Sequence, residues 1–479
     1  MFRTIGDPPP AWELRLPAEL LRLPVELARV DALLDDPAFF APFAPHFHPV
    51  IGRPSTPIEC YLRLMFLKFR YRLGYESLCA EVSDSISWRR FCRIGLDGKV
   101  PHPTTLMKLT TRCGDGAVAG LNEALWAKAA GQKLLRTGRL RADTTVVPAN
   151  VAYPTDSGLL ARAIRRIAVT GRRIQAAGGA TRIRVRDRSR AAGRRAHAIA
   201  TKLRSRAAQA RDDKQAAVGR MTGELAGLAE RAATDARRLL ANARRALRRA
   251  EARAAARAAA GVPDAAAGRR RGRLRRAVND LAGLLEVTMT VAAQARQRLA
   301  GDMPAGASRR VSLHDQDARP IAKGRLGKPV EFGYKAQVTD NDDGIILDYA
   351  VEQGNPADGP QLAPAVARVI KRAGTKPGTV TADRNYGEKS IEEDLHGLGV
   401  RHVVIPRKGK PGKARQAAER RPAFRRTIKW RTGSEGRISA LKRQYGWDRT
   451  RLDGTEGTRT WAGLGVLTHN LVKISMLAA

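Results

Sequence analysis

Three stretches decide the fold: RLRADTTVVPANV at 139–151, VEFGYKAQVTDNDDGIILDYAVEQGNPAD at 330–358 and TKPGTVTADRNYG at 375–387. The first is a short β-branched run, and the third indicates a strand that ends at Asp383. The second indicates two strands joined by a turn at 341–344, where Asn, Asp, Asp and Gly follow one another. Together they predict a sheet assembled from distant parts of the chain.

Helical patterns alternate with these strands. QLAPAVARVIKRAG at 361–374 follows the second stretch, and EKSIEEDLHGLG at 388–399 precedes a further strand, VRHVVIP at 400–406. The order is strand, insertion, hairpin, helix, strand, helix and strand, and a basic loop and further helices come after it. This order predicts an α/β fold in which helices flank a mixed sheet.

The chain is strongly basic. Its 479 residues include 87 Lys and Arg against 46 Asp and Glu, a formal net charge of +41. A surplus of this size repels itself unless a polyanion supplies the counter-charge, so we expect nucleic acid or an anionic membrane surface as partner. No run of about 18 apolar residues is present, which excludes a membrane span. The four cysteines form no C-x-x-C pair, which argues against a disulfide framework or zinc ribbon and favours a reduced, cytoplasmic compartment.

The charge is concentrated in an Arg- and Ala-rich insertion at 161–310, which holds 37 Lys and Arg but 11 Asp and Glu. Apolar residues recur at helical spacing on both sides of a break at 261–263, which predicts an antiparallel helical hairpin. Its arginines would attract phosphates, because each neutralised phosphate releases counterions. We expect an arm that clamps DNA or pairs two subunits. The alternative is a solvated helical insertion whose arginine content reflects a GC-rich genome.

The N-terminal part, residues 1–135, reads as several short helices with interleaved Arg and Lys. A Ser/Thr-Pro start at 55–57 opens an apolar helix, and shorter helical runs follow at 83–96 and 104–114. This pattern fits a helix-turn-helix-like DNA-binding module. It fits a dimerisation or packing domain equally well.

Three acids are candidates for chemistry. Asp143 and Asp383 lie on or at the end of strands, and Glu435 lies in or near the start of a helix. Three carboxylates that converge from separate elements are what a two-metal phosphoryl-transfer site requires. Each acid also has an ordinary structural explanation: Asp143 and Asp383 as turn or cap residues, and Glu435 as an acid at the positive end of its helix.

The sequence resembles the DDE transposases of bacterial insertion sequences, whose catalytic domain has an RNase H-like fold. The matching stretches are LRADTTVVPANVAYPTDSGLL, GKPVEFGYKAQV, TADRNYG, VVIPRKGK, KWRTGSEGRISALKRQYGWDRTRLDG, the terminal WAGLGVLTHNLVKI and the N-terminal IGRPSTPIECYLRLMFLKFRYRLGYESLCAEVSDSISWRRF. Outside the Arg-rich insertion, the resemblance covers about two thirds of the chain. It implies an RNase H-like catalytic core, preceded by an all-α domain and interrupted by the insertion.

The resemblance also implies roles for individual residues. Asp143, Asp383 and Glu435 would be the catalytic acids and the metal ligands. Many relatives carry Y-x-x-R-x-x-x-E-x-x-x-x-x-x-K around the last acid; Arg431 and Lys442 hold the expected spacings here, whereas Ile428 replaces the tyrosine. The implied DNA contacts come from basic side chains near the acids: Arg431, Lys442, Arg384, Arg407 and Lys408.

The implied activity is metal-dependent cleavage at transposon ends followed by strand transfer into target DNA. It would use two Mg²⁺ ions, with Mn²⁺ able to substitute, and double-stranded DNA held by a homodimer or higher oligomer in the cytoplasm, associated with the nucleoid. The alternatives are a metal-dependent nuclease without strand transfer and a non-catalytic DNA-binding protein derived from a transposase. The expected segments are 1–135 (DNA binding or dimerisation), 136–160 and 311–479 (the two parts of the catalytic domain) and 161–310 (the insertion).

Overall fold

The computed structural model describes residues 1–6, 8, 11–205, 211–262, 264–325 and 328–478. The chain divides into two compact units, one made of Met1–Asn150 with Ile321–Ala479 and the other of Val151–Pro320. The expected insertion at 161–310 lies within the second unit, while the N-terminal helices and the sheet share the first. Among the described residues, no helix has the length and apolar character needed to span a membrane.

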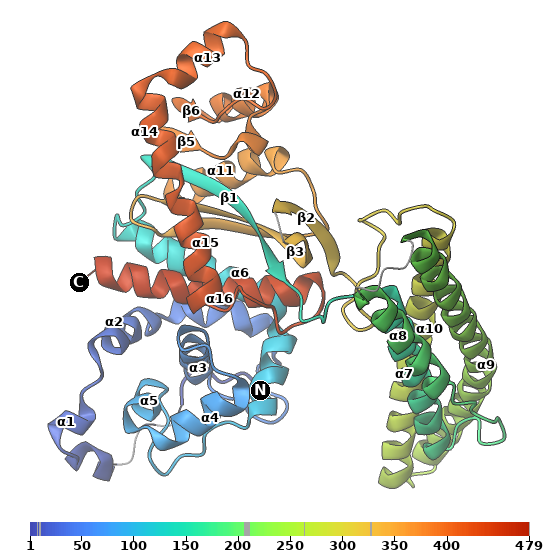
Figure 1. Cartoon of the computed structure of the whole chain (residues 1–479). Coiled ribbons are helices and arrows are strands. Elements are labelled where there is room, and N and C mark those ends of the chain that lie inside the picture. The colour runs from blue at the N-terminus through green and yellow to red at the C-terminus, as the bar shows by residue number, and fades with distance from the viewer. Residues whose placement is uncertain (7, 9–10, 206–210, 263, 326–327, 479) are drawn as a thin grey trace. The chain divides into compact units, whose positions relative to one another are not determined.

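The first unit is organised by a six-stranded mixed sheet (Figure 1). The strands follow the order β2-β3-β1-β5-β6, and β4 pairs with β3. β1 runs antiparallel to β3 and parallel to β5, while β3–β4 is antiparallel and β5–β6 parallel. The bounds are β1 (Arg139–Pro148), β2 (Arg319–Arg325), β3 (Lys328–Asn341), β4 (Ile346–Gln353), β5 (Thr379–Thr381) and β6 (His402–Val404).

The predicted hairpin at 330–358 is confirmed, because β3 and β4 are joined through the turn that follows Asn341. Gly344 has φ 77°, which an L side chain adopts only with strain, and the Asn341 side chain accepts from the backbone N–H of Ile345 at 3.0 Å. The two helices expected beside these strands are confirmed as α11 (Gly359–Ala373) and α12 (Lys389–Gly397). The expected mixed sheet with flanking helices is therefore present.

The N-terminal helices pack against the C-terminal helix α16 (Gly454–Leu477) and share one hydrophobic core with the sheet. α3 (Ile58–Arg70) is buried along nearly its whole length, from Ile58 to Phe69. A DNA-recognition role for these helices stays a prediction. The other helices of this unit are α1 (Ala18–Leu21), α2 (Val25–Leu34), α4 (Tyr75–Asp84), α5 (Ile86–Phe91), α6 (Pro103–Gly131), α13 (Lys413–Arg420), α14 (Pro422–Arg431) and α15 (Gly433–Gln444), with 3-10 turns η1 (Ala11–Arg15), η2 (Pro37–Phe39), η3 (Ala41–His46) and η4 (Arg384–Tyr386).

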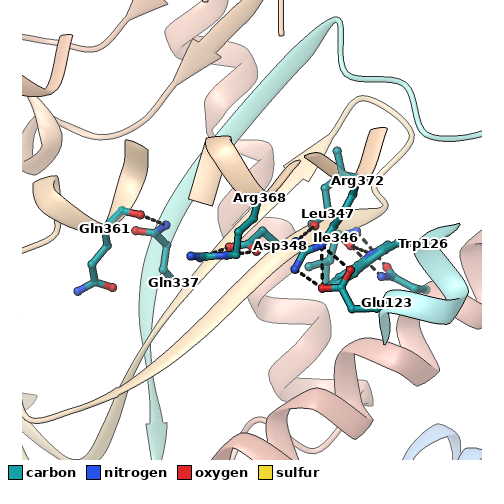
Figure 2. Close-up of polar contacts among 10 residues, drawn as sticks. Glu123, Trp126, Gln337, Ile346, Leu347, Asp348, Gln361, Arg368 and Arg372 are labelled. Atoms are coloured by element: carbon teal, nitrogen blue, oxygen red, sulfur yellow. Dashed lines mark hydrogen bonds and ion pairs between the residues drawn. The ribbon is translucent and has the colours of Figure 1, made fainter. Parts of the chain in front are cut away.

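A polar network joins α6 and α11 to β4 (Figure 2). Arg372 of α11 donates to Asp348 at 2.7 Å, pairs with Glu123 of α6, and stacks 4.0 Å from the ring centroid of Trp126. Trp126 in turn donates to the carbonyl of Ile346 at 2.8 Å. The Asp348 carboxylate is buried, and its ion pair with arginine offsets the free-energy cost of removing this charge from water. The network thus ties an N-terminal helix directly to the sheet.

The second unit is a helical bundle with its own apolar core. The predicted hairpin is confirmed: α9 (Arg211–Ala259) and α10 (Ala265–Leu299) pack along each other, and α7 (Asp156–Ala176) and α8 (Ser189–Arg204) complete the bundle. Alanines such as Ala229 and Ala233 fill the contact face of α9, and their small size lets neighbouring helices approach closely.

Candidate functional site

Asp143 lies in the middle of β1, opposite Val338 of β3. Its side chain is 13% exposed, and Oδ1 accepts from the backbone N–H of Thr144 at 2.8 Å. Burial raises the pKa of Asp143 to about 6, with further contributions from the negative charges of Asp383 and Glu435. A carboxyl held in this way favours a nearby cation over a second anion.

Asp383 comes level with Asp143 because β5 runs parallel to β1. Thr381 pairs with Arg141, and each aspartate follows its member of this pair by two residues, Asp143 within β1 and Asp383 just after the end of β5. The Asp383 side chain caps the 3-10 turn η4 and accepts from the backbone N–H of Asn385 at 2.9 Å. Burial raises its pKa, the nearby Asp358 adds to the shift, and Arg431 and Lys335 oppose it. The strand expected to end at Asp383 ends at Thr381, since Asp383 already belongs to this turn.

Glu435 lies in the first turn of α15, as the sequence predicts, and its side chain is 67% exposed. Arg431, at the end of α14, connects it to Asp143: its guanidinium lies 3.4 Å from Asp143 Oδ2 and 3.5 Å from Glu435 Oε1. Only Thr432, in a right-handed helical conformation, separates α14 from α15. The structure therefore brings Asp143 and Glu435 to one arginine, Arg431, which the sequence analysis had assigned to DNA. Asp383 is near enough for its charge to interact with both Asp143 and Arg431.

The other predicted DNA contacts differ in their surroundings. Arg384 is exposed beside Asp383, and Lys442 is half-buried on α15. Arg407 and Lys408 each form an ion pair at 2.7 Å, with Glu392 and Glu388 respectively. Arg407 and Lys408 would have to break these ion pairs before they could bind a phosphate. A role of these four residues in DNA binding stays a prediction.

Sequence reasoning missed the ion-pair cluster that holds α14 and α15 on the sheet. Arg141, two residues before Asp143, makes two hydrogen bonds to Asp340 of β3 at 3.0 and 2.8 Å and donates to the Trp430 carbonyl at 2.9 Å. Arg437 of α15 approaches the same Asp340 at 3.3 Å. A Cβ at Gly433 would collide with the Arg141 guanidinium, so the helix passes over it at a glycine. β1 also carries Arg139 and Asp143, so Arg141 did not stand out in the sequence as a buried charge.

The donor set suits a hard divalent cation, but it does not form a closed ligand cage. Within the described ranges, no group of three or more His, Cys, Asp or Glu side chains is arranged to hold a metal ion. Carboxylate oxygens are nevertheless the ligands such ions prefer. Burial is the main cause of the raised pKa of Asp143, and the charges of Asp383 and Glu435 add to it; a bound cation would stabilise the ionised carboxylate. In the absence of such a cation, the Arg431 guanidinium supplies positive charge next to Asp143 and Glu435.

Two segments of the chain match known protein families. Residues 18–112 match a family described as "Transposase domain (DUF772)", and residues 306–471 match "Transposase DDE domain". An uncharacterized protein, ORF8 in the nfe locus of Rhizobium meliloti, is 29% identical over 131 residues, which cover 25% of this chain and 61% of that protein. The chain thus spans less than two thirds of that relative, and no solved structure matches.

A mixed sheet with flanking helices, acids at neighbouring strands and these two matches define a DDE-type transposase domain preceded by a transposase-associated helical domain. The chain belongs to the insertion-sequence DDE transposases. Members of this family generally use divalent metal ions.

Proposed function

We propose that this chain cleaves DNA at the ends of its insertion sequence and joins those ends to target DNA. The observation that carries the proposal is the pairing of both Asp143 and Glu435 with Arg431, together with the charge interaction of Asp383 with Asp143 and Arg431. The sheet order, with β1 central between an antiparallel hairpin and two parallel strands, supports an RNase H-like core.

Asp143, Asp383 and Glu435 would hold the metal ions, which we take to be two Mg²⁺, with Mn²⁺ able to substitute. When bound, such ions activate the attacking oxygen and stabilise the leaving oxygen of a phosphodiester. Asp143 lies on β1 and Asp383 directly after the adjacent strand β5, and each accepts a backbone hydrogen bond, so their positions are set before DNA arrives. Glu435 is exposed and can turn toward them once it leaves Arg431.

Arg431 has two consecutive roles in this proposal. In the protein alone it offsets the charge of Asp143 and Glu435. Once the acids have a stronger cationic partner, its guanidinium is free to bind a phosphate of the DNA backbone, which it can do with two parallel hydrogen bonds. Double-stranded DNA is thus the proposed substrate, and two ends held together would need a dimer or higher oligomer.

The test is a cleavage and strand-transfer assay with the full chain, DNA carrying the element's own ends, and Mg²⁺ or Mn²⁺. Asp143→Asn, Asp383→Asn and Glu435→Gln should each reduce cleavage at least ~100-fold while leaving DNA binding intact, because each removes charge required in the transition state. Glu393→Gln is the matched control, since Glu393 is exposed and pairs only with Lys389 on its own helix among the contacts described.

Other outcomes separate the alternatives. Cleavage without joined products would identify a metal-dependent nuclease. DNA binding without cleavage under either metal would identify a non-catalytic DNA-binding protein. Cleavage that persists in the three acid variants would remove this triad from the active site.

A further inference from the structure

A groove of about 1370 Å³ opens within the helical bundle, between α9, the start of α10 and the segment after α7. Seven arginines line it, together with a single carboxylate, that of Asp264. Alanines make up much of the remaining lining, and none of the lining residues is aromatic. The groove therefore offers dense positive charge and little surface on which a base could stack.

Four of the arginines form a row on one face of α9, at every fourth position: Arg245, Arg249, Arg253 and Arg257. A helix rises about 1.5 Å per residue, so the row is about 18 Å long. A DNA strand carries one phosphate per ~3.4 Å of duplex axis, so a row of this length is long enough to contact more than one phosphate of the backbone. Arg270 and Arg271 of α10 line the same groove.

Most of this charge is not neutralised within the protein. Arg257 pairs with Asp264 at 3.1 Å, and Arg245 donates to the side chain of Asn242 at 2.7 Å. Arg249 and Arg253 are exposed, and neither has an ion-pair partner in the part of the chain that the structure describes. Like charges four residues apart on a helix repel one another. A bound polyanion would relieve this repulsion.

We propose that this groove binds the sugar-phosphate backbone of double-stranded DNA without base specificity. The choice of DNA rests on the proposed function; the presence of an anion-binding groove does not. Arginine binds phosphate with a planar, bidentate geometry, and the alanines between successive arginines let a bulky backbone approach the helix. None of the lining residues is aromatic, so the bases have no ring on which to stack, and contacts of arginines with phosphates carry no sequence information.

The experiment compares two double variants of the full chain. Arg249→Ala/Arg253→Ala removes the centre of the row. Arg244→Ala/Arg248→Ala removes two exposed arginines at the same spacing on the same helix, neither of which lines the groove. Because alanine is the strongest helix former, both variants should stay folded, and circular dichroism verifies this. Binding to a labelled duplex of arbitrary sequence is followed by fluorescence anisotropy between 50 and 200 mM salt.

The groove variant should lose roughly 10-fold or more in affinity, and the slope of log K against log salt should fall by about 1.8, since each phosphate contact contributes ~0.9. The control should keep the wild-type slope. Equal losses in the two variants would overturn the proposal, as would tighter binding of an RNA duplex of the same length. If the wild-type chain binds DNA through the groove but does not cleave DNA that carries the element's own ends, the proposed function is refuted and this inference stands.

Discussion

Lys68 is an ammonium group buried among aromatic rings of the first unit. It is 5% exposed, donates to the Leu73 carbonyl at 2.9 Å and lies 4.8 Å from the Trp461 ring centroid. Burial, together with the positive charge of Arg451, lowers its pKa to about 8. The unfolded chain therefore binds this proton more tightly than the folded chain. The resulting cost is present in full below pH 8 and disappears as the pH rises toward 10.5.

Lys68→Met should remove that cost while keeping the volume of the side chain. A shift of this size corresponds to roughly 3 kcal/mol, from which the lost hydrogen bond subtracts about 1 kcal/mol. We expect the variant to be more stable than the wild type by about 1–2 kcal/mol at pH 7, and the gap to narrow above pH 8. Urea unfolding at pH 7 and pH 9.5 measures both values. If the difference in unfolding free energy between variant and wild type were the same at both pH values, the charge on Lys68 would not be destabilising the folded chain.

For individual residues of the candidate site, the sequence predicts which side chains are candidates but not which partners they contact. Asp143, Asp383 and Glu435 were chosen as candidates from residue type, position on strands or a helix start, and resemblance to a family, and their catalytic role stays a prediction. The partnership of Arg431 with Asp143 was not, because 288 positions separate them and one arginine among many carries no signal of its partner. Arg141 and Asp340 were missed for the same reason, since only the register of β1 against β3 brings them together.

Among the elements, α15 depends on few contacts for its position on the sheet. Arg437 pairs with Asp340, which is 1% exposed and also binds Arg141. We expect Arg437→Gln to free α15 without unfolding the unit, because Arg141 still neutralises Asp340. Loss of a partly buried ion pair costs about 1–2 kcal/mol, so amide exchange in α15 should become roughly 10-fold faster.

Hydrogen exchange read by mass spectrometry measures this effect, with α16 as the internal reference. Arg443→Gln is the matched control, since Arg443 is exposed on the same helix. Unchanged protection in α15 would mean that other contacts position Glu435.

Helices and strands were predicted correctly where apolar or β-branched residues recur at one clear spacing. The hairpin of α9 and α10 was predicted from its apolar stripe, and the strands β1, β3 and β4 from β-branched alternation. The helices α7 and α8 were not separated from the surrounding Arg-rich sequence, although buried Leu160, Ala163, Ile164 and Ile167 mark one face of α7. Short strands such as β5 and β6 were predicted too long, because a turn or loop takes over their last residues.

At the scale of the whole molecule, two separate apolar cores predict two separate unfolding events. One core joins the N-terminal helices, the sheet and α16, and the other lies entirely within the helical bundle. Leu64 and Leu281 are fully buried, one in each core. A buried Leu→Ala change costs about 2–5 kcal/mol, which lowers the melting temperature of a unit the size of the bundle by roughly 4–20 °C and that of the larger first unit by less.

Leu281→Ala should therefore shift one calorimetric transition of the full chain, and Leu64→Ala should shift the other. The bundle transition should also rise in temperature when duplex DNA is added, because a ligand that binds only the folded groove stabilises the unit that contains it. Arg249→Ala/Arg253→Ala should weaken that rise, whereas Arg244→Ala/Arg248→Ala should not. If each leucine variant instead moved a single common transition, the two cores would be unfolding as one cooperative body.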